Sequence, residues 1–331
     1  MDLRSLLTRE PILERDGVLD YVGASDLDYC ANFGDQWQRF RAVQIDSLSN
    51  STESHDRFFS ETGVDATWLA GKVVLDAGCG AGRFSEIALK AGASVIAVDL
   101  SNAIYACRQT LSAFPPDRFL ALRASLFDLP LSPASCDLVI SLGVLQHTPD
   151  PLGGIAALSK LVRPGGRLAT WIYERRPIDV VHPKYFLRRF TSKLGNSEKL
   201  ALAKVLVTLF FPAGWMLSHF GEVGRKASFL LPYAARHRQR KDSLRSQWVY
   251  SVLDTYDWLG PLYDQPQTDT DVMATMKNRG LINVKRLPAR GMAIIGDAPE
   301  APRARPAVAE AGACETNLES SSPVEKRVAE S

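Results

Sequence analysis

The stretch Lys72–Asp99, KVVLDAGCGAGRFSEIALKAGASVIAVD, constrains the fold of this chain most strongly. Val73 to Leu75 is a short apolar run of the kind found in strands buried on both faces of a sheet. A glycine-rich turn follows, then a segment with helical apolar spacing from Arg83 to Ala91, and then a second apolar run that ends in Asp99. This order of strand, tight turn, helix and strand predicts a doubly wound α/β sheet.

The glycine-rich turn distinguishes between two classes of cofactor. Gly78, Gly80 and Gly82 form a G-x-G-x-G pattern, whereas dinucleotide-binding turns have G-x-G-x-x-G and place a pyrophosphate at the helix N-terminus. Asp76 precedes the first glycine, where its charge would repel a pyrophosphate and attract a cation. Asp99 ends the second strand, where it can accept two hydrogen bonds from ribose hydroxyls. The pattern favours S-adenosylmethionine, which has an ammonium, a sulfonium and a ribose diol but no phosphate.

These residues resemble the first motif of the class I S-adenosylmethionine-dependent methyltransferases, which reads VLDAGCGAGRF here. The segment Leu142–Pro149, LGVLQHTP, closely resembles the strand-four motif of that family, and the resemblance extends from about Leu27 to Gly296. It implies an enzyme with a Rossmann-like, mostly parallel sheet of seven strands, of which the last is antiparallel. NFGDQW and RFF..TG further resemble a bacterial subset that often carries a zinc ribbon, whose cysteines this chain lacks; we expect no metal site.

The resemblance also implies a set of cofactor-binding residues at the ends of the predicted strands. The family usually has an acid at the position of Ser125 to accept a hydrogen bond from adenine, and here the Ser125 hydroxyl takes that place. The residues expected to bind the cofactor are Arg57, Asp76, Ala77, Gly78, Gly80, Gly82, Asp99, Leu100, Ser125, Leu126, Phe127, Leu142 and Gly143.

The strand-four segment places His147 near the expected position of the methyl group, because ligands bind beyond the carboxyl ends of parallel strands. Its imidazole suits proton transfer at neutral pH, so we expect His147 to be the base for a hydroxyl acceptor, with Asp254 and Asp257 as second candidates. The structural alternative is a histidine that only packs at the start of a helix, and for an amine acceptor His147 would only orient it. The residues expected to contact the acceptor are Trp37, Tyr256, Trp258 and Tyr263.

The segment Glu174–Gln267 is far longer than a connection between sheet elements needs, and we interpret it as a helical insert. Leu200 to Phe211 is strongly apolar, and we expect Pro212 and Gly214 to interrupt it, which leaves it too short to span a membrane. Three interpretations stay open: a lid over the acceptor, a contact in a homodimer, or a helix at a membrane surface. The flanking residues that favour a membrane are Lys184, Arg188, Arg189 and Lys193.

Charge is distributed unevenly along the chain, although the net charge is only +2. Residues 174–245 hold 15 Lys and Arg against 5 Asp and Glu, which leaves 24 basic against 32 acidic residues elsewhere. A basic run in this segment consists of Arg236, Arg238, Arg240, Lys241 and Arg245. We expect an anionic, saccharide or amphiphilic small-molecule acceptor and no DNA partner. The alternatives are a methyltransferase for tRNA and a non-catalytic adaptor at a membrane.

The remaining features set the expected domain plan. We expect a helical cap segment at 1–63, the cofactor-binding core at 64–173, the insert at 174–267, the end of the sheet at 268–296 and a disordered tail at 297–331. The five cysteines are scattered, which favours reduced thiols over a disulfide framework. The first residues lack the apolar run of a secretory signal, so we expect a cytoplasmic protein, with membrane-surface attachment as the alternative.

Overall fold

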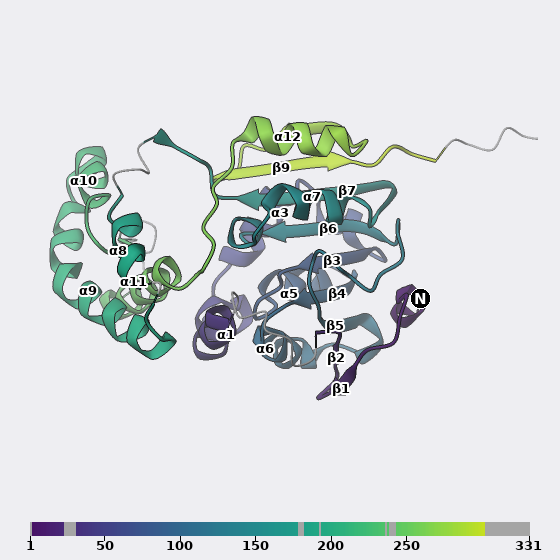
Figure 1. The fold of residues 1–331 in the computed structure, drawn as a ribbon, viewed down its shortest axis with the longest axis horizontal. Helices are drawn as coiled ribbons and strands as arrows, with labels where there is room; N and C mark the ends of the chain where they lie inside the picture. Colours follow the sequence, from purple (N-terminus) through teal and green to yellow (C-terminus); the bar gives the residue numbers. More distant parts are fainter. Residues whose placement is uncertain are drawn as a thin grey trace, which may run out of the picture. The chain divides into compact units, whose positions relative to one another are not determined.

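The computed structural model describes residues 2–22, 31–177, 182–191, 193–235, 237 and 243–301. Residues 1–300 form one compact unit, shown as a ribbon in Figure 1. Cys79, Cys107 and Cys136 are buried free thiols, as predicted. The predictions for the basic run at 236 and 238–241 and for the tail beyond Ala301 concern residues outside the described ones.

Within the described residues, nine strands form one sheet in the order β1-β2-β5-β4-β3-β6-β7-β9-β8. Neighbours from β2 to β7 in this order are parallel, while β1, β9 and β8 pair antiparallel to the strands beside them. The strands are β1 (Leu13–Arg15), β2 (Val18–Asp20), β3 (Val73–Ala77), β4 (Ser94–Asp99), β5 (Phe119–Arg123), β6 (Cys136–Leu142), β7 (Val162–Ile172), β8 (Ile282–Arg286) and β9 (Met292–Asp297).

The predicted count of seven strands is wrong, because the N-terminal residues add β1 and β2 at one edge. Val18, Leu19 and Asp20 pair in parallel with the residues of β5 that end at Arg123. Val18 and Leu19 are buried, and the Asp20 carboxylate lies 3.0 Å from Arg123 Nη1. A strand of three residues has too short a periodic pattern for the sequence to predict that it pairs with β5. The doubly wound α/β class and the antiparallel last strand are as predicted.

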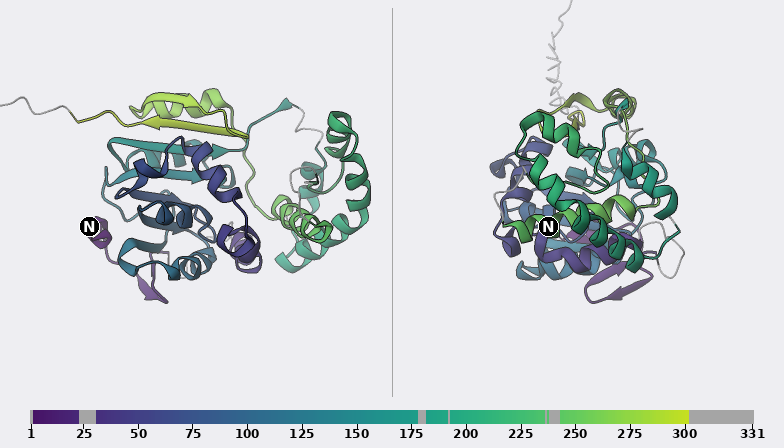
Figure 2. Two further views of the ribbon diagram at one scale, coloured as in Figure 1. Left: turned by 180° about the vertical axis from the view of Figure 1, so that it is seen from behind. Right: turned by 90° about the vertical axis from the view of Figure 1, so that its left-hand side faces the viewer.

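Helices cover both faces of the sheet. The helices outside the insert are α1 (Ala31–Gln44), α2 (Asp46–Ser49), α3 (Glu53–Thr62), α4 (Ala66–Leu69), α5 (Arg83–Lys90), α6 (Ala103–Thr110), α7 (Pro151–Ser159) and α12 (Asp269–Asn278). On one face, Ile155 of α7 and Met276 of α12 join a core with Leu75 of β3. On the other, Phe58 of α3 and Ile87 of α5 pack in a second core. Figures 1 and 2 show the sheet between these layers.

The helical segment between β7 and α12 contains α8 (Pro183–Thr191), α9 (Asn196–Leu217), α10 (Gly221–Ser228) and α11 (Leu244–Leu259). Glu174 forms a bridge with Gln267, so the chain leaves the sheet and returns to it at adjacent positions. In both figures these helices lie beyond the carboxyl ends of the parallel strands. They have a core of their own, built around Ala203, Val207 and Tyr256.

The prediction that Pro212 and Gly214 interrupt the apolar helix is wrong, because α9 runs through both residues. Pro212 lies on the exposed side of the helix, while Val207 before it and Gly214 after it are buried. A proline inside a helix costs about 3 kcal/mol, which packing on both sides of it can offset. The result is a single helix of 22 residues where sequence suggested two short ones.

Candidate active site

A cavity of about 230 Å³ lies at the carboxyl ends of the central strands. Its floor comes from the residues that follow β3, β4, β6 and β7, which a parallel sheet gathers at one edge. Residues of α1, α3 and α11 complete the wall, so segments far apart in the sequence meet here. The residues that carry its chemistry are Gln36, Trp37, Gln44, Arg57, Gly78, Gly80, Arg83, Asp99, His147, Tyr173, Asp254 and Asp257.

The glycine turn after β3 is fixed by hydrogen bonds to β4. The backbone N–H groups of Gly78 and Cys79 donate to the Val98 carbonyl at 2.8 and 2.9 Å. Gly80 has a φ of +54°, and a Cβ there would lie 3.0 Å from the Trp37 ring. The turn therefore needs glycine both for its backbone conformation and for the close approach of the aromatic ring that covers it.

Asp99 ends β4 in the cavity wall. One carboxylate oxygen accepts from the Gly80 N–H at 2.9 Å, and the other accepts from the N–H and hydroxyl of Ser101 at 2.9 and 2.7 Å. Burial raises the pKa of Asp99, while the hydrogen bonds from Ser101 and Gly80 oppose that shift. Two carboxylate oxygens offer about four acceptor positions, so Asp99 can still accept from a ligand diol.

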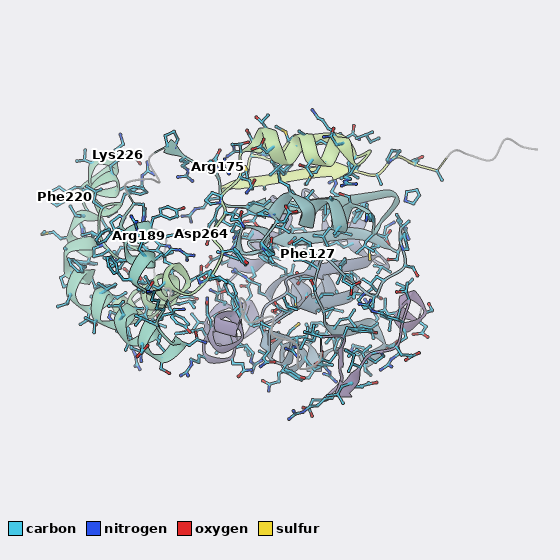
Figure 3. All side chains as sticks on the ribbon, viewed as in Figure 1. Phe127, Arg175, Arg189, Phe220, Lys226 and Asp264 are labelled. Atoms are coloured by element: carbon cyan, nitrogen blue, oxygen red, sulfur yellow. The ribbon has the colours of Figure 1, made fainter. Side chains whose placement is uncertain are left out.

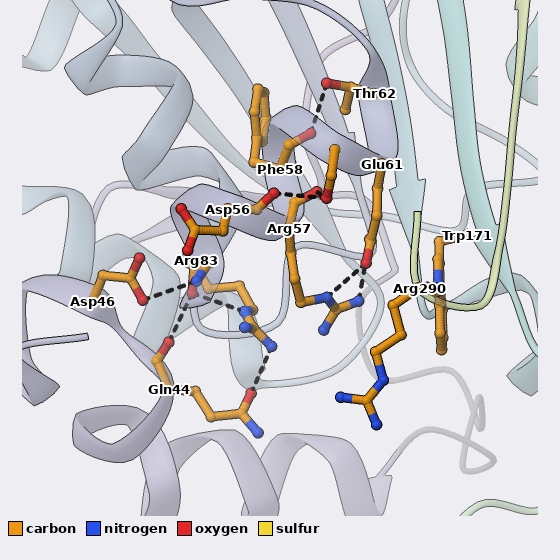
Figure 4. Close-up of polar contacts among 12 residues, drawn as sticks. Gln44, Asp46, Asp56, Arg57, Phe58, Glu61, Thr62, Arg83, Trp171 and Arg290 are labelled. Carbon is orange, nitrogen blue, oxygen red and sulfur yellow. Dashed lines mark hydrogen bonds and ion pairs between the residues drawn. The ribbon is translucent and has the colours of Figure 1, made fainter. Parts of the chain in front are cut away.

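Two arginines give another part of the wall a positive character (Figure 4). Arg83 Nε donates to the Ser54 hydroxyl at 3.1 Å and Nη1 to Gln44 Oε1 at 3.4 Å, both uncharged partners. Burial, followed by the positive charge of Arg57, lowers the pKa of Arg83 to about 10. Arg57 itself forms an ion pair with Glu61 at 2.7 Å. This part of the cavity is therefore suited to an anionic group such as a carboxylate.

His147 lies in η5 (Leu145–His147), directly after β6. Its Nδ1 lies 3.1 Å from the carbonyl oxygen of Tyr263, and because a carbonyl can only accept, Nδ1 carries the proton. Burial lowers the pKa of His147, which the nearby negative charge of Asp257 opposes. The neutral imidazole therefore keeps an unprotonated Nε2, and His147 is a residue of the cavity wall.

Helix α11 divides its residues between two faces. Tyr250, Asp254 and Asp257 line the cavity at helical spacing, whereas Val252 and Tyr256 pack toward α9. Tyr256 is fully buried there, so the prediction that it lines the acceptor pocket is corrected. Asp257 is the next residue of α11. Because successive residues of a helix are rotated by about 100°, its carboxylate lies on the cavity side.

Asp257 is connected to residues from other parts of the chain. One carboxylate oxygen accepts from Gln36 Nε2 at 3.4 Å and the other from the Tyr173 hydroxyl at 3.4 Å. The second amide atom of that glutamine, Oε1, is buried and has no hydrogen-bond partner among the described residues. This oxygen is a buried hydrogen-bond acceptor in the cavity wall, so it is suited to a hydrogen-bond donor of a ligand, such as an ammonium group.

A second cavity, of about 1070 Å³, shares Arg57, Trp171, Tyr173 and Tyr250 with the first. It extends toward the helical segment, so the two cavities adjoin along these shared residues. Its wall combines aromatic, basic and acidic side chains. The aromatic and basic ones are Trp258, Tyr185, Phe229, Lys184, Arg176, Arg245 and Arg290, and the acidic ones are Glu53, Asp56, Glu61 and Glu174.

The structure brings most of the sequence-predicted site residues to the first cavity. Of the cofactor-binding set, these are Arg57, Gly78, Gly80, Asp99, Leu100, Leu126, Leu142 and Gly143, together with Trp37, His147, Asp254 and Asp257 from the other sets. Their roles remain predictions, because the structure gives their positions only.

Other predicted residues lie behind or beside the wall. Asp76 is buried, accepts from the Ser85 hydroxyl at 2.6 Å and does not line the cavity, because it points into the core beneath α5. Ala77 and Gly82 are also packed behind the turn. Ser125 accepts from the Phe127 N–H, and the Phe127 side chain, labelled in Figure 3, is 38% exposed.

The remaining two predicted acceptor residues take different places. Tyr263 reaches the site through its backbone carbonyl, which holds His147. Trp258 lines the second cavity and packs against His182, with ring centroids 4.7 Å apart.

Several wall residues escaped the sequence reasoning. Gln36 and Gln44 lie on the helix that carries Trp37, and Arg83 follows the glycine turn directly. The spacing of the two glutamines on one helical face was a readable signal, because positions eight apart share a face. Tyr173 had no comparable signal, since only the tertiary fold brings it to Asp257.

The donor set fits S-adenosylmethionine, which the sequence predicts. A carboxylate at Asp99 suits a ribose diol, the open Gln36 acceptor suits an ammonium, and the Arg57–Arg83 region suits a carboxylate. A dinucleotide fits less well, because the acid Asp76 is buried behind the glycine turn, where a pyrophosphate would bind.

Comparison with known proteins agrees with this fit. Residues 75–170 match the family described as methyltransferase domain. A ubiquinone biosynthesis O-methyltransferase from Thiobacillus denitrificans (strain ATCC 25259 / T1) is 36% identical over 215 residues, covering 64% of this chain and 79% of that protein. A protein of the same name from Pseudomonas paraeruginosa (strain DSM 24068 / PA7) is 37% identical over 113 residues, covering 33% of this chain and 47% of that protein.

The chain thus spans about half the length of several curated relatives that it matches. Among solved structures, magnesium protoporphyrin IX methyltransferase from Synechocystis PCC 6803 is 17% identical, with a TM-score of 0.43, over 83% of this chain and 97% of that chain.

Proposed function

The chain belongs to the class I S-adenosylmethionine-dependent methyltransferases, and from this premise we propose that it methylates a hydroxyl group of a small anionic or amphiphilic molecule. The observation that carries the proposal is His147, whose Nδ1 lies 3.1 Å from the Tyr263 carbonyl in the cavity wall. A hydroxyl nucleophile needs a base, and this contact leaves Nε2 able to act as one. The named activity of the Thiobacillus relative, O-methylation, supports the same choice of atom.

The cofactor, S-adenosylmethionine, supplies a methyl group on a positively charged sulfonium when it is bound. Asp99 would accept hydrogen bonds from its ribose, and Gln36 Oε1 would accept one from its ammonium. Arg57 and Arg83 would face its carboxylate. These residues would hold the cofactor at several separate points, so much of the rate enhancement in the proposed mechanism would come from positioning.

In this mechanism His147 accepts the proton of the acceptor hydroxyl at Nε2. Burial lowers the pKa of the imidazole, so it is neutral and able to accept a proton at pH 7. The Tyr263 carbonyl fixes the ring, and the negative charge of Asp257 stabilises the imidazolium that forms. If Asp257 were instead the base, replacing His147 would leave most of the activity.

The second cavity supports an acceptor that is anionic and partly apolar. Arg245 supplies positive charge in its wall, where Lys184 is already paired with Asp264, and Trp258, Tyr185 and Phe229 supply apolar surface. Small-molecule sites commonly combine such aromatic walls with a few charged groups. Since this cavity adjoins the one at His147, an acceptor bound in it would extend its hydroxyl toward the base.

The test is transfer of label from methyl-labelled S-adenosylmethionine to a panel of acceptors by the full chain. The panel contains phenols and saccharides with and without a carboxylate or phosphate, the matching amines, and tRNA. We expect label on hydroxyl groups of the anionic acceptors. His147→Gln should lower kcat by about 10²–10⁴-fold and leave cofactor affinity unchanged, because glutamine cannot act as the base. Asp99→Ala should instead weaken cofactor binding, measured by calorimetry.

Labelling of amines or tRNA alone, or full activity of His147→Gln, would overturn the proposal. Cofactor binding without transfer to any acceptor would favour the non-catalytic adaptor. The pH profile gives an independent check: because burial lowers the pKa of His147, kcat/KM should reach half of its plateau value at a pH below about 6.5. A midpoint above that pH would assign the base to another group.

A further inference from the structure

Helix α9 and the start of α10 expose a row of large apolar side chains to solvent. We define this apolar face by Val205, Leu209, Met216, Phe220 and Val223, which are 53%, 67%, 56%, 64% and 76% exposed. Val205, Leu209 and Met216 are four and seven residues apart, which places them along one side of α9. Phe220 follows in the turn after α9, and Val223 lies in the first turn of α10. Elsewhere in the described residues, exposed large apolar side chains occur singly or in pairs, such as Ile12 with Leu13 and Phe186 with Phe190, whereas α9 and α10 expose a longer series.

The opposite side of α9 is already occupied. Leu200, Ala203 and Val207 are buried against α11, and Gly214 lies so close to Tyr233 that a Cβ there would overlap its hydroxyl. By length and hydropathy alone α9 could cross a membrane, and only 17% of its most apolar window is buried in the fold. A membrane span would have to break the packing on α11, whereas a helix lying on a surface keeps it.

Basic side chains accompany the apolar face. Lys204 and Lys226 are exposed on α9 and α10, and Arg189 is exposed on the neighbouring α8. Figure 3 shows Phe220 and Lys226 projecting outward from these helices. The acids nearby, Glu198 and Glu222, are engaged with Gly195 and Arg225. The face therefore combines exposed apolar groups with a positive border.

We propose that the apolar face of α9 and α10 binds the surface of an anionic lipid membrane, with its apolar side chains at the headgroup–acyl boundary and the surrounding lysines against lipid phosphates. The charge of the segment favours lipid over a second copy of the chain. A two-fold interface would place each patch against the same patch of its partner, so Lys204 and Lys226 would face like charges. Anionic lipid would instead neutralise the exposed Lys204, Lys226 and Arg189. The inference does not depend on which acceptor is methylated.

The experiment is sedimentation of the full chain with vesicles of phosphatidylcholine alone or mixed with phosphatidylglycerol. We expect the wild type to sediment with the mixed vesicles and much less with the neutral ones, and salt to release it, because exposed charges are screened. The double variant Leu209→Glu, Phe220→Glu should lower the partition coefficient at least tenfold. Ile12→Glu, Leu13→Glu is the matched control, since it places the same charge at two other exposed apolar positions, and it should sediment like wild type.

A second variant keeps the test independent of folding. Lys204→Glu, Lys226→Glu changes only exposed side chains, and it should lose binding to the mixed vesicles while retaining wild-type cofactor affinity. The proposal is overturned if the wild type sediments with neither vesicle, or if both double variants sediment like wild type. It is also overturned if sedimentation velocity shows a wild-type dimer that Leu209→Glu, Phe220→Glu converts to monomer, because the second copy is then the partner.

Discussion

The sheet edge and the helical segment border the same cavities but are built differently. At the sheet edge, backbone groups of Gly78, Cys79 and Gly80 are held by Val98 and Asp99, so the cradle is set by main-chain geometry. In the helical segment, α11 presents side chains to the cavity on one face and packs on α9 with the other. The comparison teaches that strand order determines which residues meet at the sheet edge. In the helical segment, the face of the helix on which a residue lies determines whether its side chain reaches the cavity.

Burial differs in the same way. Every residue of β3 is buried, including Asp76, while α9 leaves large apolar side chains in solvent. The sheet thus contains groups whose removal or ionisation must affect folding, and the helical segment contains groups whose removal should not. Three measurements test this difference, beginning with the largest expected effect.

Replacing the buried acid of β3 should change how stability depends on pH. Burial raises the pKa of Asp76 to about 7, so between about pH 4 and pH 7 the folded state holds a proton that the unfolded state has released. Wild-type stability should therefore fall as pH rises through this range, by roughly 4 kcal/mol, and then level off. Asp76→Asn removes this titration. Urea unfolding of both ligand-free proteins at several pH values measures the difference, and a difference that stays constant with pH would contradict the prediction.

A matched pair of leucine substitutions compares the two regions directly. Leu75 is fully buried in β3, whereas Leu209 is 67% exposed on α9. Leu75→Ala should lower the free energy of unfolding by about 3 kcal/mol, because it removes buried methyl groups and leaves a cavity. Leu209→Ala should change it by less than about 0.5 kcal/mol. Equal losses in chemical denaturation would show that the apolar face is covered in solution and would remove the contrast.

The contact that joins the two regions should have the smallest of the three effects. The Tyr250 hydroxyl on α11 donates to the Val43 carbonyl on α1. Tyr250→Phe removes that donor and should lower the free energy of unfolding by about 1 kcal/mol. Tyr105→Phe, on α6, is the control and should have almost no effect. No difference between the two variants would mean that α1 and α11 are held together by other contacts.

The sequence predicted the sheet-edge site better than the helical one for a physical reason. Gly78, Gly80 and Asp99 belong to one local unit, and adjacent parallel strands necessarily bring them together. Asp257 was predicted as a site residue, but its contact with Gln36 was not. The two residues are 221 positions apart, and no local pattern connects them. Tyr256 was misplaced because an isolated sequence does not reveal which face of α11 meets α9.

The course of α9 through Pro212 shows the same limit. Local propensity favours a break there, and only the packing of Val207 and Gly214 against the rest of the segment explains why the helix continues. The two added strands, β1 and β2, likewise follow from pairing with β5 rather than from their own three-residue patterns. In each case a long-range contact decides a local structure.

The pair Gln36–Asp257 has a consequence for the order of events in turnover. Gln36 Oε1 is the unpartnered oxygen proposed to bind the cofactor ammonium, and Asp257 lies near His147, the proposed base. If cofactor and acceptor bind there as proposed, a ligand that orders one of these side chains restricts the other, and the two binding equilibria are linked. By reciprocity, the factor by which cofactor tightens acceptor binding equals the factor by which acceptor tightens cofactor binding. The same linkage acts on the products, and it makes their departure a step that can limit the rate of each cycle.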